Sequence, residues 1–374
     1  MVDLARKNLL HDKLRFAITI SGVAFAVTLV LVQIGLFLGL LDNATITIER
    51  IPADFWVTSK NTPNVDFAHT FPDSRVQRVR SVPGVQTADN LIVQFMNVAL
   101  PSGAEESTVV YALENFERWG LPWKVVQGNV SDLRRGAYVF LDASAAKRFG
   151  PFELGDYREF AGSRLKIIGV TKEARSFTTT PLSFMDFDLA QRVFTNLSNR
   201  ASYILVKLAP GADPEAVRAE IRRRLPFNDV FTRREWASRS RNYWIISTGL
   251  GLNMFITVFL GCLVGVVVVA QTLYTSTMEH LKEFGTVKAI GGGNSDIYGI
   301  LARQATISAL VGFVFGAIPS YLMSKLIARA DLKLIIPPAL WTGVFVGTIV
   351  MCLGAALISF RKVASIDPAL VFRT

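Results

Sequence analysis

The chain contains very little cysteine and histidine. Its 374 residues include two cysteines and three histidines. Cys262 and Cys352 both fall inside long apolar stretches, so they offer no disulfide framework and no metal-ligand spacing, and we expect them to pack as small apolar residues. His69 is the only histidine between residues 42 and 243, so a metal cluster there would need carboxylates alone. We therefore expect no metal site.

Sequence motifs of hydrolases and nucleotide-binding proteins are also missing. The sequence has no Gly-x-Ser-x-Gly and no His-Glu-x-x-His. It lacks the phosphate-binding pattern Gly-x-x-x-x-Gly-Lys-[Ser/Thr], and no lysine follows Gly291-Gly292-Gly293. We expect a chain that is not an enzyme and that binds no cofactor directly.

Long apolar runs are present instead. The chain is 51% hydrophobic and 19% charged, which is too apolar for an ordinary soluble protein and too charged for a bundle buried entirely in a membrane. A membrane span needs about 20 residues, and four runs reach that length. Residues 42–243 carry regular charges, turn residues and short alternating runs. We predict four transmembrane α-helices, one plus three, with a large α+β extracytoplasmic domain inserted between the first and second.

The predicted segments follow from these changes in composition. They are an interfacial helix at 1–15, spans at 16–41, 244–273, 299–327 and 339–360, the extracytoplasmic domain at 42–243, a cytosolic segment at 274–298, a short outer loop at 328–338 and a cytosolic tail at 361–374. Tyr243 and Trp244 lie where an outer aromatic belt is expected.

Basic residues set the expected orientation. The formal net charge is +10. In a chain with membrane spans we interpret this excess as attraction to anionic lipid on the cytosolic side rather than as nucleic-acid binding. Most basic residues near the span ends fall on the side of the N-terminus: Arg6, Lys7, Lys13, Arg15, Lys282, Lys288, Arg303, Arg361 and Lys362. Lys325, Arg329 and Lys333 run against this rule. We expect both termini to be cytosolic.

The region 42–243 alternates strand and helix signals. Strands are predicted at 54–59, 91–100, 108–113, 137–141, 165–170 and 203–208, and helices at 74–81 and 213–225. Asp213 is a candidate N-cap, and Pro214 suits the first helical position. This pattern predicts an α+β domain large enough for its own core.

Little in this domain points to chemistry. Asp186 and Asp188 are two residues apart, which would place both on one face of a strand, but Phe184 and Phe187 beside them favour a structural role. Arg222–Arg224 are either an anion patch or, as we favour, a solvated helix end. The aromatic residues Phe55, Trp56, Phe116, Trp119 and Trp123 are interpreted as core or as a protein contact. We expect a binding and assembly module.

Each predicted span contains Gly-x-x-x-Gly. The helix-packing pairs are Gly35/Gly39, Gly261/Gly265, Gly312/Gly316 and Gly343/Gly347. Four-residue spacing places both glycines on one helix face and lets two backbones approach closely. Because the spans hold almost no ionisable residue, a tightly packed bundle that could also dimerise is favoured over an aqueous or proton-conducting path.

The charged stretch between the second and third spans has a helical pattern. Met278, Leu281 and Phe284 recur every third residue, Glu279, Lys282, Glu283 and Lys288 are polar, and a glycine run follows. This stretch is either a solvated loop or a short amphipathic helix that transmits force between the membrane and a cytosolic partner.

The residues of this stretch resemble a known family. Glu283-Phe284-Gly285-x-x-Lys288-Ala289-Ile290-Gly291 is similar to the coupling segment of FtsX/MacB-type ABC permeases. The resemblance extends in order along the chain through Val82–Val85, Gly128–Arg148, Lys166–Val170, Val206–Ile221 and the Asp367-Pro368 tail, although Val371 departs from the tail pattern. Each match alone is weak, and their order makes the resemblance specific.

The resemblance implies a permease subunit of a MacB/DevC-type exporter in the bacterial inner membrane. ATP and Mg would be used by a separate cytosolic ABC ATPase dimer, whose motion the permease transmits. The implied coupling residues are Met278, Glu279, Leu281, Lys282, Glu283, Phe284, Gly285, Lys288, Ala289 and Gly291. Further implied partners are a second permease copy, a periplasmic membrane-fusion adaptor and an outer-membrane channel.

Three other functions remain open. The first is a lipoprotein-releasing permease of the same superfamily, which would need an apolar groove in the outer domain. The second is an FtsX-like signalling element that controls a cell-wall hydrolase, for which an outer domain of about 200 residues is large. The third is a membrane-anchored receptor without a motor, which the coupling segment disfavours.

Overall fold

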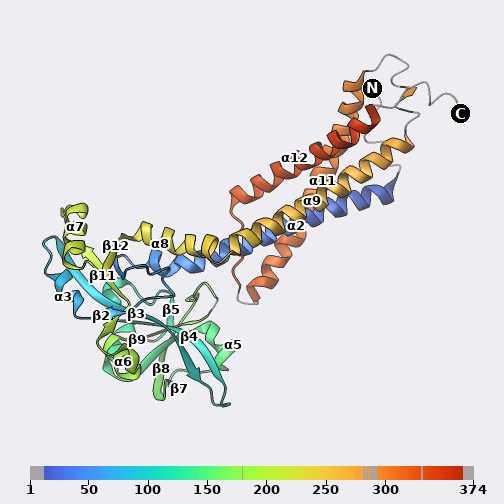
Figure 1. The fold of residues 1–374 in the computed structure, drawn as a ribbon. Coiled ribbons are helices and arrows are strands. Elements are labelled where there is room, and N and C mark those ends of the chain that lie inside the picture. The colour runs from blue at the N-terminus through green and yellow to red at the C-terminus, as the bar shows by residue number, and fades with distance from the viewer. Residues whose placement is uncertain are drawn as a thin grey trace. The chain divides into compact units, whose positions relative to one another are not determined.

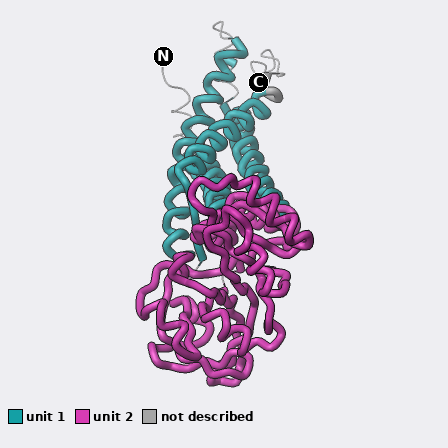
Figure 2. The backbone as a smooth tube through the Cα atoms, turned by 90° about the vertical axis from the view of Figure 1, so that its left-hand side faces the viewer, with its two compact units in different colours: residues 1–39, 251–374 teal, residues 40–250 magenta. Residues whose placement is uncertain are grey.

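The chain divides into two compact units. The computed structural model describes residues 12–178, 180–280, 283, 285–286, 293–329 and 332–364, without the side chains of 328–329 and 361–364. One unit, here called the helical unit, consists of Met1–Gly39 and Gly251–Thr374. The other, the sheet unit, is Leu40–Leu250 (Figure 2).

Four long helices build the helical unit: α2 (Lys13–Arg50), α9 (Leu250–Glu279), α11 (Asn294–Arg329) and α12 (Pro338–Ala364) (Figure 1). All four are long and apolar enough to cross a membrane, which confirms the predicted spanning helices. Helix α2 extends beyond the first predicted span, 16–41, because it continues to Arg50 and contributes its last residues to the sheet unit.

Small and branched apolar side chains form the core of the helical unit. Its buried members are Val23, Val27 and Leu31 of α2, Val269 and Leu273 of α9, Ile297, Leu301, Ala305 and Ala309 of α11, and Cys352, Ala355 and Ala356 of α12. Cys352 is fully buried among them, as expected of a small apolar packing residue.

The glycine pair of α11 lies directly against α2. A Cβ at Gly312 would meet Val23 at 2.5 Å, and one at Gly316 would meet the Ala24 carbonyl at 2.7 Å. Because neither position carries a side chain, the two helices approach closely here, as the Gly-x-x-x-Gly spacing predicts.

The glycine pair of α9 agrees with the prediction only in part. A Cβ at Gly261 would come within 2.9 Å of Leu29 of α2. Gly265 differs, because it packs against two helices rather than one: a Cβ there would lie 3.0 Å from the Ala26 Cβ of α2 and 3.0 Å from the Met351 sulfur of α12. Gly265 therefore makes room for a methionine side chain as well as for α2.

The other two pairs do not contact a helix in the predicted way. Gly35 and Gly39 of α2 lie against the connection between α11 and α12, where a Cβ at Gly39 would come within 1.8 Å of the Lys333 carbonyl. A Cβ added at Gly343 or Gly347 of α12 would have no described atom within 4 Å. Helix-to-helix packing through glycine therefore centres on α2.

A ten-stranded mixed sheet forms the sheet unit. Its order is β12-β1-β11-β3-β4-β9-β6-β8-β5, with β7 paired to β3 and β8. Their bounds are β1 Phe55–Ser59, β3 Val85–Ala99, β4 Glu105–Leu113, β5 Val125–Gln127, β6 Tyr138–Asp142, β7 Tyr157–Phe160, β8 Ser163–Thr171, β9 Leu182–Asp186, β11 Tyr203–Leu208 and β12 Asn228–Thr232. The β4–β9 and β6–β8 pairs are parallel, and the others are antiparallel. A second, two-stranded sheet pairs β2 (Phe71–Pro72) with β10 (Arg200–Ala201).

Short helices complete the unit. They are α3 Arg75–Arg80, α4 Phe116–Trp119, α5 Ala146–Phe149, α6 Phe187–Val193, α7 Pro214–Arg224 and α8 Arg233–Asn242, with 3₁₀ turns at Val130–Arg135, Ala143–Ala145 and Thr195–Leu197 and a π-helical turn, η4, at Tyr243–Ser247.

The two faces of the sheet carry separate cores. Because side chains alternate along a strand, Phe55 and Val57 of β1 join one core, and Trp56 between them joins the other. The first core includes residues of α3, α6 and α7. The second includes Trp236 of α8 and Ile46 and Ile48 from the end of α2. The end of α2 is therefore an integral part of the sheet unit.

Most predicted elements of this unit are confirmed. The strand predicted at 203–208 coincides with β11, and Ser74 and Ser81 flank α3. Asp213 caps α7 by accepting a hydrogen bond from the Glu215 N–H, with Pro214 at the first helical position. The predicted core aromatics are buried, including Trp56 and Trp119. The strands β5, β7, β9 and β12 and the helix α8 were not predicted.

Two predictions are wrong. Asp186 and Asp188 do not share a strand face: Asp186 ends β9 and caps α6, where it accepts a hydrogen bond from the Asp188 N–H at 3.1 Å. Trp244 is not in an exposed aromatic belt. Its ring stacks on Phe177 at 3.7 Å between centroids, and only 6% of its surface is exposed. Packing in the sheet unit outweighs the membrane-interface preference of tryptophan at this position.

Asp66 is a buried carboxyl group of the sheet unit for which the described residues provide no ion-pair partner. Asp66 is 4% exposed, and its loop is held by Tyr203, whose hydroxyl donates to the Val65 carbonyl at 2.9 Å. Burial raises the pKa of Asp66 to about 7, and a hydrogen bond from the Phe177 backbone opposes this rise. Between the two pKa values, the Asp66 carboxyl group therefore keeps its proton in the folded state and has released it in the unfolded chain.

This burial predicts a pH-dependent stability. The pKa of Asp66 is raised on folding, so its contribution to the free energy of unfolding is complete below about pH 4 and is lost as the pH rises through about 7. Asp66→Asn should remove this loss, with a melting temperature close to wild type below about pH 4 and higher at pH 8, by several degrees. Tryptophan fluorescence of the detergent-solubilised chain measures it. The control Asp132→Asn, on a partly exposed residue paired with Arg135, should keep the wild-type slope. An unchanged slope in Asp66→Asn would contradict the assignment.

Candidate functional site

The candidate coupling residues lie at one end of the helical unit, where α2 begins, α9 ends and α11 begins. Four of the ten predicted residues are described: Met278, Glu279, Glu283 and Gly285. The others, Leu281, Lys282, Phe284, Lys288, Ala289 and Gly291, lie outside the described residues.

The coupling segment does not begin as a separate helix. Met278 and Glu279 are the last residues of α9, and the His280 N–H continues the helical pattern by donating to the Ser276 carbonyl at 3.1 Å. His280 Nδ1 then lies 3.0 Å from Glu283 Oε1. The end of the apolar helix α9 therefore overlaps the first residues of the charged stretch.

Glu279 makes a two-pronged ion pair with Arg15. Arg15 Nη1 and Nη2 donate to the two carboxylate oxygens of Glu279 at 2.5 and 2.8 Å. Arg15 also lies 3.3 Å from Asp12. The guanidinium side chain is 24% exposed and the Glu279 side chain 54% exposed. Paired hydrogen bonds of this kind fix relative orientation as well as distance. The start of α2 is thus joined to the end of α9.

A polar layer lies beneath this ion pair. Thr19 of α2 and Gln304 and Ser308 of α11 are buried, and with Thr272 and Ser276 of α9 they surround a cavity of about 20 Å³. Ser308 Oγ has no hydrogen-bond partner among the described residues. The volume suits a single water molecule. The end of the bundle is therefore polar inside, in contrast to its apolar middle.

A second set of contacts joins α2 to α8 in the sheet unit. Ser240 Oγ donates to the Ala44 carbonyl at 3.1 Å, and Arg241 Nη2 donates to Glu49 Oε1 at 3.0 Å. Helix α8 is followed by the η4 turn and then by α9. The chain from α8 to α9 is therefore bonded to α2 in both units, by Arg241–Glu49 in one and by Glu279–Arg15 in the other.

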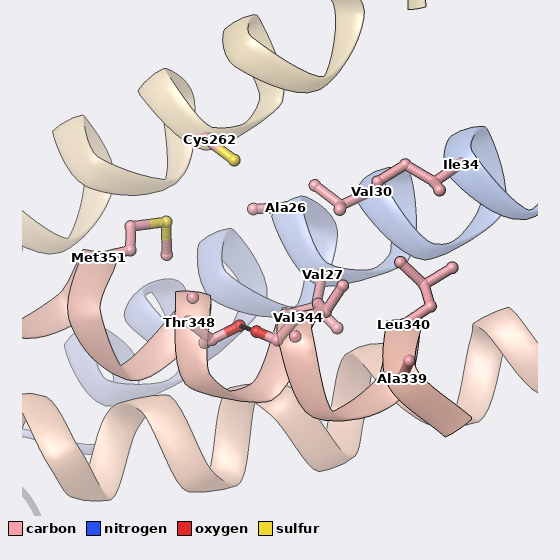
Figure 3. A pocket seen from close by; sticks show the side chains of 12 residues that line it. Ala26, Val27, Val30, Ile34, Cys262, Ala339, Leu340, Val344, Thr348 and Met351 are labelled. Carbon is pink, nitrogen blue, oxygen red and sulfur yellow. Dashed lines mark hydrogen bonds between the residues drawn. The ribbon is translucent and has the colours of Figure 1, made fainter. Parts of the chain in front are cut away.

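The middle of the helical unit contains an apolar cavity of about 290 Å³ (Figure 3). Its lining residues come from α2, α9 and α12: Ala26, Val27, Val30, Ile34, Cys262, Ala339, Leu340, Gly343, Val344, Gly347, Thr348 and Met351. The hydroxyl of Thr348 donates to the Val344 carbonyl at 2.7 Å, so it offers no free hydrogen. The cavity contains no charged group and is not a polar channel.

The arginines at the end of α7 mainly form hydrogen bonds within the sheet unit. Arg223 and Arg224 both donate to Glu220, and these hydrogen bonds lower the pKa of Glu220 to about 2. Arg222 donates to the Val230 carbonyl at 3.2 Å. Among the described residues, no group of His, Cys, Asp and Glu side chains is arranged to hold a metal ion.

Arg15 was missed as a site residue. The sequence placed it in a basic flank, which is common beside any membrane span. Its partner Glu279 lies 264 positions away, and no local spacing connects them. The polar layer was also missed, although Gln304 and Ser308, four residues apart on one face of a predicted span, are a readable signal.

Two family descriptions match the chain. Residues 16–224 match the MacB-like periplasmic core domain, and residues 254–368 match the FtsX-like permease C-terminal region. Together they cover both units.

Known proteins of similar sequence have corresponding names. An uncharacterized ABC transporter permease of Mycobacterium tuberculosis is 26% identical over 100% of this chain and 99% of its own length. One from Methanocaldococcus jannaschii is 21% identical over 87% of this chain and 84% of its own length. The macrolide export ATP-binding/permease protein MacB of Agrobacterium fabrum is 22% identical over 96% of this chain, which spans 60% of that protein.

Among solved structures, the periplasmic region of MacB from Actinobacillus actinomycetemcomitans is similar to this chain, with a TM-score of 0.40 and 15% identity over 50% of this chain and 92% of that one. The family descriptions cover most of the chain, and the full-length relatives are ABC transporter permeases. The chain belongs to the MacB/FtsX family of ABC transporter permeases.

Proposed function

We propose that the chain is the membrane subunit of an ATP-driven exporter of the DevC type and transmits mechanical motion. A separate ATPase dimer binds the coupling residues, and its closure shifts the helices of the helical unit. The sheet unit, outside the membrane, then moves and acts on the partners and the substrate. The inner membrane is the expected location, with both termini cytosolic.

The observation that carries this proposal is that α2 is one helix shared by both units. Residues Lys13–Gly39 of α2 belong to the helical unit and Leu40–Arg50 to the sheet unit. The start of α2 is bonded to Glu279, at the edge of the coupling segment. A displacement of the coupling segment therefore acts directly on a helix whose other end is built into the sheet unit.

The character of the helical unit supports transmission rather than passage through a pore. The cavity among α2, α9 and α12 is apolar, and the polar layer at the bundle end holds about 20 Å³. A hydrated substrate would need a lining of polar groups through the apolar middle. We infer that the substrate enters and leaves on the side of the sheet unit.

Three kinds of partner follow from the proposal. A second copy of the permease would provide a symmetric seat for an ATPase dimer. The family resemblance adds a membrane-fusion adaptor and an outer-membrane channel. ATP and Mg would be bound by the ATPase, because this sequence lacks the phosphate-binding pattern.

No specific observation favours the alternatives. Lipoprotein release would need an apolar groove in the sheet unit. A hollow of about 320 Å³ beside α7 has the charged residues Asp213, Glu220 and Arg224 in its lining, whereas the apolar cavity of about 290 Å³ is lined by α2, α9 and α12. The sheet unit spans Leu40–Leu250 and has a core on each face of its sheet. This is more structure than a small signalling ectodomain requires.

The first test addresses ATPase binding. The double variant Glu283→Ala, Phe284→Ala should reduce the amount of ATPase that co-purifies with the full chain from native membranes by about tenfold, since an aromatic side chain central to an interface often contributes about 2 kcal/mol or more. The variant should remain inserted and folded, because the described Glu283 side chain is exposed. Glu105→Ala, Glu106→Ala, in the β3–β4 hairpin of the sheet unit, is the control and should bind normally. Undiminished ATPase in the coupling variant would refute this binding site.

The second test addresses transmission through α2. Arg15→Glu and Glu279→Arg should each lower the ATP-dependent activity of the assembled complex roughly two- to fivefold, which corresponds to about 0.5–1 kcal/mol for a partly exposed ion pair. The double swap re-forms the pair in the opposite order and should recover most of the activity. ATPase co-purification should be unchanged in Arg15→Glu, because Arg15 is not one of the coupling residues.

A matched control separates this effect from general charge changes. Lys124 and Glu173 form an exposed ion pair in the sheet unit, with side chains 45% and 59% exposed. The variants Lys124→Glu and Glu173→Lys should not alter the activity. If the Arg15–Glu279 double swap is no more active than the single variants, the ion pair does not transmit the motion.

A further inference from the structure

Three arginines gather on one side of the sheet unit. Arg75 and Arg78 lie on α3, and Arg200 lies on β10. Burial is the main cause that lowers the pKa of Arg75, and the positive charges of Arg78 and Arg200 lower it further. Arg75 is therefore near enough to both of them for their charges to repel its own. This repulsion is retained in the folded domain.

None of the three forms an ion pair with a carboxylate of the described residues. Arg75 donates to Asn228 Oδ1 at 2.6 Å and lies over the Phe71 ring. Arg200 donates to Thr70 Oγ1 at 2.7 Å and to the Thr70 carbonyl. These are neutral acceptors, which position a guanidinium without cancelling its charge.

Several other arginines of the same unit pair with carboxylates. Arg80 pairs with Asp89 and Glu114, Arg118 with Asp89, Arg218 with Glu235, and Arg223 and Arg224 with Glu220. The two aspartates nearest in sequence to the unpaired group also have neutral partners: Asp73 accepts from Gln191 and Asp229 from the Asn61 backbone. Among the described residues, the three arginines of this group therefore have no carboxylate as an ion-pair partner, and the two nearest aspartates are engaged elsewhere.

An exposed aromatic residue lies beside these arginines. Phe227 is 70% exposed and precedes Asn228, the residue that Arg75 contacts. Its backbone carbonyl accepts a hydrogen bond from the Lys60 N–H at 3.2 Å, so the turn that presents the ring is anchored. Phenylalanine and arginine are both enriched at protein interfaces, where aromatic anchors contribute much of the binding energy.

This surface belongs to the face of the sheet that α2 does not cover. Phe71, Val76 and Val79, which lie under the arginines, are in the first core, whereas Ile46, Ile48 and Trp236 are in the second. The segments of the sheet unit that lead into the membrane-spanning helices, the end of α2 and α8, therefore pack on the opposite face of the sheet.

We propose that Arg75, Arg78, Arg200 and Phe227 form the docking surface for an acidic protein segment that carries an apolar side chain. Carboxylates of the partner neutralise the three guanidinium groups, and its apolar residue covers the Phe227 ring. A protein is favoured over a lipid surface because Asn228 and Thr70 hold two of the guanidinium groups in fixed positions, which suits paired hydrogen bonds to carboxylates. The proposal rests on the proposed function only in placing the sheet unit outside the membrane.

The test uses the full chain in nanodiscs of zwitterionic lipid. The probe is a fluorescent synthetic peptide in which glutamates alternate with leucine and phenylalanine, and the same peptide with glutamine in place of glutamate is the reference. The acidic peptide should bind, more weakly as salt is added, and the glutamine peptide should not. ATPase is not needed, so this result is independent of coupling.

Variants locate the binding. Arg78→Glu, Arg200→Glu changes two residues on the exposed surface and should weaken binding about tenfold, and Phe227→Ser should weaken it several-fold. The control Arg134→Glu, Arg135→Glu makes the same change in net charge at an exposed 3₁₀ turn and should bind as wild type does. Melting temperatures establish that each variant is folded.

Three outcomes would overturn the proposal. The acidic peptide does not bind, or it binds all variants equally, which would indicate a general effect of net charge. Alternatively, vesicles of phosphatidylglycerol bind the wild type and lose binding in the arginine variant while the peptide does not bind, which would assign the surface to anionic lipid. The docking proposal and the coupling proposal can be separated, because the variant Glu283→Ala, Phe284→Ala should lose ATPase binding and still bind the acidic peptide.

Discussion

The structure depends on the continuity of α2. This helix supplies the surface on which the glycine faces of α9 and α11 pack, and its last turns enter a core of the sheet unit through Ile46 and Ile48. A helix satisfies its own backbone hydrogen bonds, so it can pass from an apolar environment into a folded domain without exposing polar groups. Both units therefore share one element, and neither unit is complete without it.

Ion pairs join this helix to two other segments of the chain. Arg15–Glu279 joins α2 to the end of α9, and Glu49–Arg241 joins it to α8. Each pair is partly exposed and modest in energy, so each can be re-formed or exchanged during a cycle more readily than buried packing. The glycine contacts in between are rigid by comparison, because a close-packed interface has little room for adjustment. We therefore expect the middle of the bundle to be rigid and the contacts at its ends to be adjustable.

The sequence predicted those parts of the fold that local patterns determine. Apolar length identified four spanning helices, and capping residues such as Asp213 located α7. It did not predict that the helix of the first span continues to Arg50. Residues 42–50 contain an aspartate, three threonines or asparagines and β-branched isoleucines, and burial of Ile46 and Ile48 in a distant core explains the helix there. The parallel β4–β9 pair, the stacking of Trp244 on Phe177 and the Arg15–Glu279 pair also join residues far apart in sequence. No local spacing contains that information.

The central claim is that motion passes along an unbroken α2. The most direct measurement places a fluorophore at Arg50→Cys, in a chain with Cys262 and Cys352 replaced by alanine, and records its response when ATP is added to the complex with the ATPase. Asn43→Pro interrupts the helix between the two units by removing a backbone hydrogen bond, at a cost of about 3 kcal/mol. The account predicts a response with the intact helix and none in Asn43→Pro, although the ATPase remains bound. The same response in both chains would contradict it.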